Sequence, residues 1–500
     1  MGKLKIGWSE VDITPKDKRI RLAGQFFERI SEYVETPIVA TTLAIEDGAE
    51  QMIFCACDLV KIGRNLIRRV REKVAELDAA IPTDKIILSA IHSHTSHVYD
   101  YEATNYAAFA GGPKGILDSF LPREKQYVAK VSDDTENVMT AREALLFLVD
   151  SISASIVEAW QNRTSGSFAT GFGRAAIGMC RRVCYSDGSA KMWGDTNTAA
   201  FTELEGGNDS GIEMLFFYGA DGKLTGVAAS VACPAQVVEH RTFISSDYWG
   251  KVRILLREKY GEDLKVLGLC APAGDQCPRD LIRWVNPETP IDDPNIDRPD
   301  YIERDADPSM FDINGSWKVG KRIVNEIIDA LEEVTEKKDE AILKHENLTV
   351  ELPLRRVTPK EYEHAVEQME KFAARVTDHV NFADNAAMHV HTGTIMRWKQ
   401  QHIQDIVPVE VHIVRLGSVA IATNPFELFL DYGNQIRARS RARQTILVQL
   451  ACDGLGYLPT EKAEKGSHYS AYVTSGKVGH AGGEMLVRKT TEEINKFFAE

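Results

Sequence analysis

Short apolar runs and amphipathic segments alternate along the first part of the chain. Residues 51–57 and 85–90 are apolar runs of strand length, which predicts two buried strands. Between them, apolar residues recur at helical spacing opposite a face of arginine and lysine: Leu66, Ile67, Val70, Val74 and Leu77. A strand, a helix and a second strand in this order predict parallel pairing through a crossover.

The same patterns predict the later elements. Helices are expected over residues 143–161, 248–260, 317–334, 359–376, 425–438 and 483–498. Strands are expected over residues 224–233, 265–270, 409–423 and 445–451. Residues 286–315 are rich in proline and aspartate and poor in apolar side chains, which predicts a lid over the site rather than core. No repeat or linker divides the chain, so we predict one α/β domain over residues 1–500, with mixed sheets flanked by helices.

Composition and charge restrict the class of protein. The chain is 44% hydrophobic and 26% charged, which is typical of soluble globular proteins. Its net charge of -14 argues against nucleic acid as a partner, and no apolar run reaches membrane-spanning length. The first residues contain no apolar signal core, and the eight cysteines form no CxxC pair. We therefore expect a cytoplasmic protein with no stable membrane association.

Two histidines follow the strand predicted at residues 85–90. His92 and His94 would point to the same side of an extended chain, because side chains alternate with a period of two. Two imidazoles at a strand end can bind one divalent metal ion. The alternative is that both are hydrogen-bonded histidines in a polar loop.

Other chemically active residues also follow predicted strands. They are Asp58, Cys233, Asp275, Cys277, Glu427 and Tyr457. Ligands of α/β proteins bind beyond the carboxyl ends of strands, so we predict that these residues converge on one cleft. Each has a structural alternative. Asp58 can cap the next helix, Cys233 can fill an apolar gap, and Glu427 can lie in the first turn of a helix.

Several separated motifs resemble those of the neutral ceramidase family, from about residue 6 to residue 498. They are Asp12-Ile13-Thr14-Pro15, Ile91-His92-Ser93-His94-Thr95-Ser96, Gly274-Asp275-Gln276-Cys277-Pro278, Asn424-Pro425-Phe426-Glu427 and Gly456-Tyr457-Leu458-Pro459-Thr460. The resemblance implies zinc bound by His92, Glu427 and Tyr457. It also implies an active-site tyrosine at Tyr469 and a substrate-contacting arginine at Arg181 or Arg182.

The departures from the family concern the metal site and the substrate. Counting back from Ser246-Asp247 places Cys233-Pro234 where the family has its second zinc histidine. Thiolate is a good zinc ligand, so Cys233 can complete the site; His240 is the rival candidate. Cys277 replaces the serine of its motif. We also expect the protein to lack the family's C-terminal β-sandwich domain and secretion signal, which would count against a membrane lipid as substrate.

We therefore predict zinc-assisted hydrolysis of an amide bond in a small soluble molecule. His94 would transfer protons, Tyr469 would stabilise the oxyanion, and Arg181 would hold a polar part of the substrate. Arg182 and Asp275 are the further substrate-binding candidates. An esterase or lactonase on the same zinc site, a metal-free thiol hydrolase using Cys277, and a non-catalytic binder of a small ligand remain as alternatives.

Overall fold

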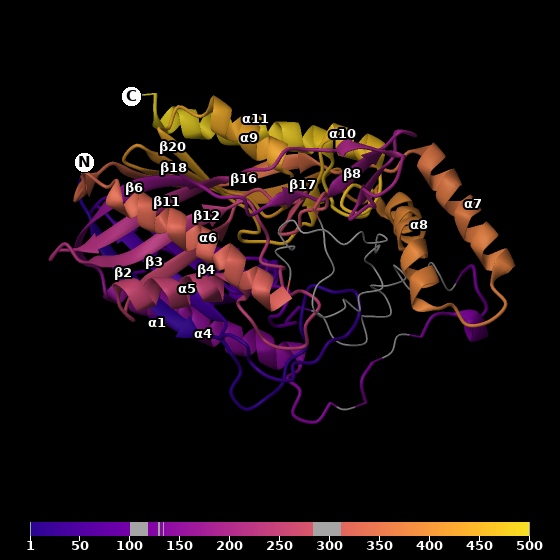
Figure 1. The fold of residues 1–500 in the computed structure, drawn as a ribbon, viewed down its shortest axis with the longest axis horizontal. Helices are drawn as coiled ribbons and strands as arrows, with labels where there is room; N and C mark the ends of the chain where they lie inside the picture. Colours follow the sequence, from indigo (N-terminus) through magenta and orange to yellow (C-terminus); the bar gives the residue numbers. More distant parts are fainter. Residues whose placement is uncertain (1, 101–118, 129–130, 134, 284–311, 500) are drawn as a thin grey trace.

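The computed structural model describes residues 2–100, 119–128, 131–133, 135–283 and 312–499 (Figure 1). Two sheets lie between two layers of helices, with α1 and α4 on one outer side and α9 and α11 on the other. The larger sheet has eight strands in the order β13-β12-β11-β6-β2-β3-β4-β5, and the smaller has four in the order β16-β17-β18-β20. Both contain parallel and antiparallel pairs. The predicted α/β class, with mixed sheets flanked by helices, is confirmed.

The strands have the following bounds. The larger sheet contains β2 (Lys5–Asp12), β3 (Val39–Glu46), β4 (Gln51–Cys57), β5 (Ile86–Ala90), β6 (Thr164–Arg174), β11 (Gly211–Gly219), β12 (Leu224–Val231) and β13 (Lys265–Cys270). The smaller contains β16 (Leu343–Pro353), β17 (Ile406–Leu416), β18 (Val419–Thr423) and β20 (Gln444–Val448). Short ladders join β1 (Gly2–Lys3) to β15 (Glu340–Ala341), β7 (Met179–Cys180) to β14 (Gln276–Cys277), β8 (Arg182–Tyr185) to β9 (Ala190–Met192) and β10 (Phe201–Leu204), and β19 (Glu427–Leu428) to β21 (Tyr457–Leu458).

The helices have the following bounds. They are α1 (Arg64–Leu77), α4 (Ala141–Gln161), α5 (Asp247–Tyr260), α6 (Asp312–Glu332), α7 (Pro359–Arg375), α8 (Phe382–Gln400), α9 (Leu430–Arg439), α10 (Glu461–Gly466) and α11 (His480–Phe497). Capping boxes begin α4 at Thr140 and α7 at Thr358. The predicted face of α1 is buried except for Leu77, and α1 connects the parallel strands β4 and β5 as expected.

Two predictions about elements were wrong, and one helix was not predicted. Residues 409–423 form two antiparallel strands, β17 and β18, which turn at Gly417 in the left-handed region (φ 59°). The helix predicted from residue 425 begins only at Leu430, because Glu427 lies in β19. The helix α8 was missed, since its buried side is largely polar or small rather than apolar: Asn385, Met388, Thr392, Gly393, Thr394 and Ile395.

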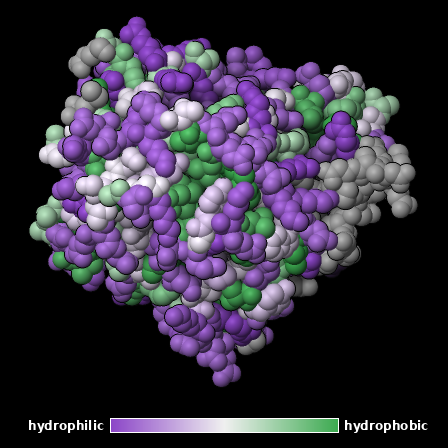
Figure 2. Space-filling model, turned by 60° about the vertical axis from the view of Figure 1, so that its left-hand side comes forward, coloured by the Kyte–Doolittle hydropathy of each residue, from purple (hydrophilic) through white to green (hydrophobic). Residues whose placement is uncertain are grey.

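The main core lies between the two sheets and extends to α1 and α4. The face shown in Figure 2 is largely hydrophilic, with small apolar patches between polar side chains. None of the described helices is long and apolar enough to cross a membrane. The single-domain organisation stays a prediction. We predicted a lid over residues 286–315. Residues 286–311 lie outside the described residues, and residues 312–315 belong to α6.

Asp58 neither caps α1 nor lies among the site residues described below. The N-cap of α1 is Gly63. Asp58 follows β4, and its carboxylate accepts two hydrogen bonds of 2.7 Å from Arg253 of α5 and one of 2.9 Å from the backbone N–H of Val39. Both side chains of this ion pair are almost completely buried. The pair therefore joins α5 to the larger sheet.

We predict that Asp58→Ala lowers the free energy of unfolding by about 3–5 kcal/mol, because it leaves the buried Arg253 charge without a partner. Urea denaturation measures this change. The control is Glu72→Ala, which removes a solvent-exposed i,i+4 pair with Arg68 and is expected to cost no more than about 0.5 kcal/mol. Equal effects of the two substitutions would contradict this account of Asp58.

Candidate functional site

The short parallel ladder of β19 and β21 brings Glu427 beside Tyr457. The two residues are direct partners in register, and the backbone N–H of Glu427 donates to the carbonyl of Gly456 at 3.0 Å. Glu427 is partly exposed, whereas Tyr457 is buried. A carboxylate and a phenol from distant parts of the sequence therefore occupy adjacent positions at one strand end.

His92 faces this pair from the end of β5. We expected His92 in an extended chain, but its backbone is in the left-handed region (φ 69°). Nδ1 lies 2.6 Å from the carbonyl oxygen of Val60, and Nε2 lies 3.4 Å from Oε2 of Glu427. A carbonyl only accepts, so Nδ1 carries the hydrogen and Nε2 of the neutral ring has none. Burial lowers the pKa of His92 to about 4, although Glu427 acts in the opposite direction.

His94 lies next to His92 and forms a second pair with a carboxylate. The two imidazole centroids are 4.8 Å apart, and Nδ1 of His94 lies 3.2 Å from Oε2 of Glu239. Burial, together with the charges of Arg29 and Arg181, lowers the pKa of His94 to about 3. Burial raises the pKa of Glu239, although the positive charge of the nearby Arg181 acts to lower it. The pair thus joins a neutral imidazole to a desolvated carboxyl group.

Arg181 supplies a buried positive charge to the same place. One of its terminal nitrogens lies 3.0 Å from the carbonyl of Gly274 and 3.4 Å from the hydroxyl of Tyr457. Burial alone would lower the pKa of Arg181, but Tyr457 and the other acidic groups around it raise that pKa. The guanidinium therefore stays charged and offsets the buried carboxylates.

Tyr469 lies beside Tyr457, and aromatic side chains extend from it. The two tyrosine rings are 5.4 Å apart in an edge-to-face arrangement. Phe26 packs on Tyr469 at 5.7 Å and is followed by His389 of α8 at 6.3 Å. Burial raises the pKa of Tyr469, and Glu427 raises it further, so its hydroxyl keeps its proton at neutral pH.

Arg182 and Asp275 hold neighbouring segments in place. Arg182 is fully buried, pairs with Glu205 through two nitrogens and donates to the carbonyl of Tyr469 at 3.0 Å. The Asp275 carboxylate accepts from the backbone N–H of Leu430, the first residue of α9, at 2.9 Å. Burial raises the pKa of Asp275 to about 6. These contacts favour a positioning role, and contact of either residue with substrate stays a prediction.

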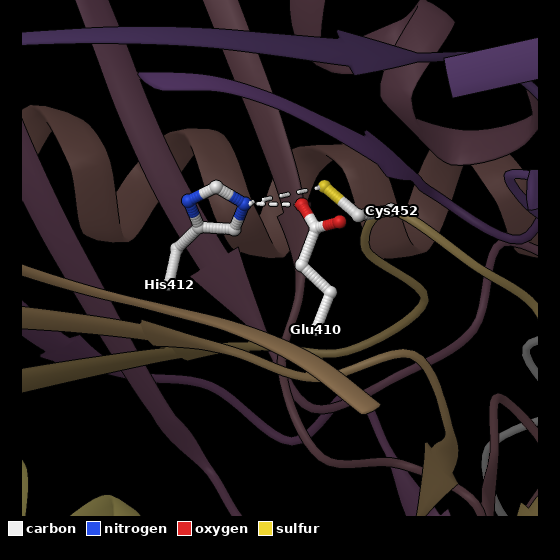
Figure 3. A group of neighbouring side chains, drawn as sticks. All are labelled: Glu410, His412 and Cys452. Carbon is white, nitrogen blue, oxygen red and sulfur yellow. Dashed lines mark hydrogen bonds and ion pairs between the residues drawn. The ribbon is translucent and has the colours of Figure 1, made fainter. Parts of the chain in front are cut away.

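The remaining candidates lie at the border of the site. Cys233 and Cys277 are fully buried. Burial raises the pKa of Cys277 to about 12 and that of Cys233 well above its usual value. Nε2 of His240 lies 3.9 Å from Asp312. Among the described residues, the group of potential metal ligands whose donor atoms all lie within 4.8 Å of one another is elsewhere in the fold (Figure 3). Neither Cys233 nor His240 forms such a group with His92 and Glu427. The fourth metal ligand therefore stays a prediction.

Sequence reasoning missed several residues that face the site. Glu239 is the most important, because its carboxylate is the partner of His94. Its one signal in the sequence was a carboxylate directly after the apolar pair Val237-Val238, in a segment without predicted structure. Phe26 and His389 gave no signal, since they meet Tyr469 only through tertiary packing.

Comparison with known proteins identifies the fold. No protein-family model matches the chain, and no curated protein matches it. The solved neutral ceramidase from Pseudomonas aeruginosa is similar with a TM-score of 0.66 at 14% sequence identity, covering 99% of this chain and 75% of that chain. A ceramidase complexed with C2 gives a TM-score of 0.66 at 13% identity, covering 98% of this chain and 74% of that chain. The chain therefore has a ceramidase-like fold over nearly its whole length.

Gly274 permits the close approach that places Glu427, which gives a direct test. A Cβ at residue 274 would lie 2.3 Å from the backbone carbonyl oxygen of Glu427, so β19 would have to move. We predict that Gly274→Ala lowers the free energy of unfolding by about 1–3 kcal/mol in urea denaturation. The control is Gly207→Ala, where a Cβ meets no atom within 4 Å. A harmless Gly274→Ala would contradict this account of the packing.

Proposed function

We propose that the chain is a zinc-dependent hydrolase that cleaves an amide bond in a small molecule. The observation that carries the proposal is the geometry of His92, whose hydrogen-free Nε2 faces a Glu427 oxygen at 3.4 Å. Two groups with lone pairs that face each other in a buried place favour a cation between them. The fold shared with solved ceramidases supports an amide as the bond that is cleaved.

The residues fit zinc in donor type and in surroundings. Zinc takes imidazole nitrogen and carboxylate oxygen as ligands, and Tyr457 adds a phenol oxygen beside Glu427. Histidine ligands usually donate their second N–H to a carbonyl or carboxylate, as His92 does to Val60. When bound, zinc would polarise the carbonyl of the substrate and lower the pKa of a water molecule toward neutrality.

His94 and Glu239 would move the proton. His94 is neutral at physiological pH. Among the described residues, the buried Nδ1 of His94 has no hydrogen-bond partner, and neither has its buried Nε2. That nitrogen can accept a proton from the attacking water and return it to the leaving amine. Glu239, 3.2 Å from Nδ1, would orient the ring and stabilise the imidazolium that forms. A buried imidazole without a partner is costly unless a ligand or water uses it.

Tyr469 and Arg181 would stabilise the negative charge that develops on the substrate oxygen. The Tyr469 hydroxyl keeps its proton and can donate a hydrogen bond. Arg181 holds a permanent charge in a buried place, where electrostatic interactions are stronger than in water. Both groups are fixed before the reaction, so little reorganisation is required.

The aromatic side chains indicate the type of acyl group. Phe26 and Tyr469 present apolar ring surface next to the polar groups, and Trp193 lies within 6.0 Å of Arg181. Such rings bury apolar area. We infer a small amide with an apolar acyl group. An ester or lactone could use the same groups, so a substrate panel has to distinguish these classes.

The metal-free thiol mechanism finds little support in the geometry. A cysteine nucleophile needs a lowered pKa, whereas burial raises the pKa of Cys277 to about 12. Its thiol donates to the carbonyl oxygen of Arg279 at 3.4 Å. All eight cysteines are free, which supports the proposed location in the reducing cytoplasm.

Metal analysis and kinetics on the same variants test the proposed function. We predict that His92→Ala loses one equivalent of zinc per chain and at least about 100-fold in turnover of N-acyl amides, because it removes a metal ligand. The matched control is His402→Ala, an exposed histidine outside the site, which should keep both. The panel includes esters and lactones. A folded His92→Ala protein with full zinc content and activity would contradict the proposal. A wild-type protein that binds zinc but hydrolyses no amide, ester or lactone would also contradict it and would favour a non-catalytic binder of a small ligand.

Cys233 is the proposed fourth ligand, and two substitutions test it. Its segment lies next to the histidine segment, because the backbone N–H of Ala235 donates to the carbonyl of Ile91 at 3.1 Å. As a ligand it would be a thiolate. Cys233→Ala should then lose most of the zinc, and Cys233→His should retain it. A buried apolar cysteine predicts the opposite order, since alanine would be tolerated and histidine would overpack the site. Zinc content of the two proteins decides, and the opposite order would make His240 the ligand to test.

A further inference from the structure

A second group of potential metal ligands lies on the smaller sheet. Glu410 and His412 point to the same face of β17, two residues apart, and Cys452 follows β20 (Figure 3). Their donor atoms all lie within 4.8 Å of one another. Nε2 of His412 lies 2.7 Å from Oε1 of Glu410 and 3.7 Å from the sulfur of Cys452. Carboxylate, imidazole and thiol thus converge on one point.

A chain of hydrogen bonds fixes which nitrogen of His412 carries hydrogen. Nδ1 of His345 lies 3.0 Å from the carbonyl of Gln51, which only accepts, so this nitrogen donates. Nε2 of a neutral His345 must then accept from Nδ1 of His412, 2.9 Å away. Nε2 of a neutral His412 is therefore left without hydrogen, although it faces the Glu410 carboxylate.

Arg71 of α1 places a positive charge at this point. One of its nitrogens lies 2.6 Å from Oε1 of Glu410, 3.4 Å from Nε2 of His412 and 3.9 Å from the sulfur of Cys452. The same guanidinium lines a cavity of about 570 Å³ together with Glu410 and Cys452.

We propose that Glu410, His412 and Cys452 bind a zinc ion, and that Arg71 occupies the position of the ion until zinc displaces it into the cavity. Oxygen, nitrogen and sulfur donors together suit zinc, whereas magnesium and calcium prefer oxygen alone. The thiol releases its proton to solvent when it binds, and a water from the cavity takes the fourth position. His345 holds the ligand His412 in orientation from behind.

This site shares no ligand with the one proposed around His92. The backbone N–H of Cys452 donates to the carbonyl of Leu88 in β5, four residues before His92. Cys452 therefore contacts β5 within the strand, whereas His92 lies beyond the end of the strand at Ala90. The two centres are therefore separate, and the second stands whether or not the first binds zinc.

Cobalt binding to the purified chain tests the proposal, because a thiolate ligand gives Co²⁺ a charge-transfer absorption band. The measurement uses the metal-free His92→Ala protein, so that the first centre is removed. We expect one equivalent of cobalt with a thiolate band, which the additional Cys452→Ser substitution abolishes. The control adds Cys184→Ser, a half-buried cysteine outside the cluster, and should keep the band. Absence of the band, or its persistence in Cys452→Ser, would overturn the proposal.

Arg71 provides a second, independent readout. Arg71→Gln removes the competing charge, so cobalt should bind at least about tenfold more tightly than to the unsubstituted chain. Arg68→Gln is the matched control, because Arg68 lies on the same helix and lines the same cavity but pairs with Glu72. If Arg71 is instead the permanent counter-ion of Glu410, Arg71→Gln will bind no cobalt and lose stability. That result, or an unchanged affinity, would contradict displacement of Arg71.

Discussion

The parallel pairing of β19 with β21 is the constraint on which the candidate site depends. It joins two segments of two residues each and sets Glu427 directly beside Tyr457. A third segment closes on the pair, because the backbone N–H of Gly274 donates to the carbonyl of Leu428 at 2.8 Å. Only a residue without a side chain permits this approach. Three distant parts of the sequence are thus fixed to one another by backbone contacts, and these contacts set the positions of the side chains in the candidate site.

Burying so many ionisable groups in one place has an electrostatic cost that the structure only partly offsets. Two carboxylates, Glu427 and Glu239, face histidines that burial keeps neutral. Arg181 supplies a permanent positive charge between them and the tyrosines. Unpaired buried polar groups destabilise a fold. Groups retained despite this cost point to function, and a bound cation would satisfy both His92 and Glu427.

The sequence was most informative where secondary structure and chemistry coincide. An apolar run predicts the strand ending before His92, and helical periodicity predicts α1; the structure has both, and α1 connects two parallel strands. Glu427 was assigned to a helix, because a two-residue strand leaves no periodic pattern. Glu239 was missed, since its role arises only from its distance to His94 in space. Polar residues buried by tertiary contacts, such as those of α8, carry no local signal.

Anomalous X-ray diffraction at the zinc absorption edge, from crystals of the zinc-loaded chain, tests the central claim most directly. The account predicts an anomalous peak bounded by Nε2 of His92, the carboxylate of Glu427 and the hydroxyl of Tyr457. The position of the peak also shows whether Cys233 or His240 approaches the ion. Zinc bound elsewhere in the chain, with no peak between His92 and Glu427, would contradict the account.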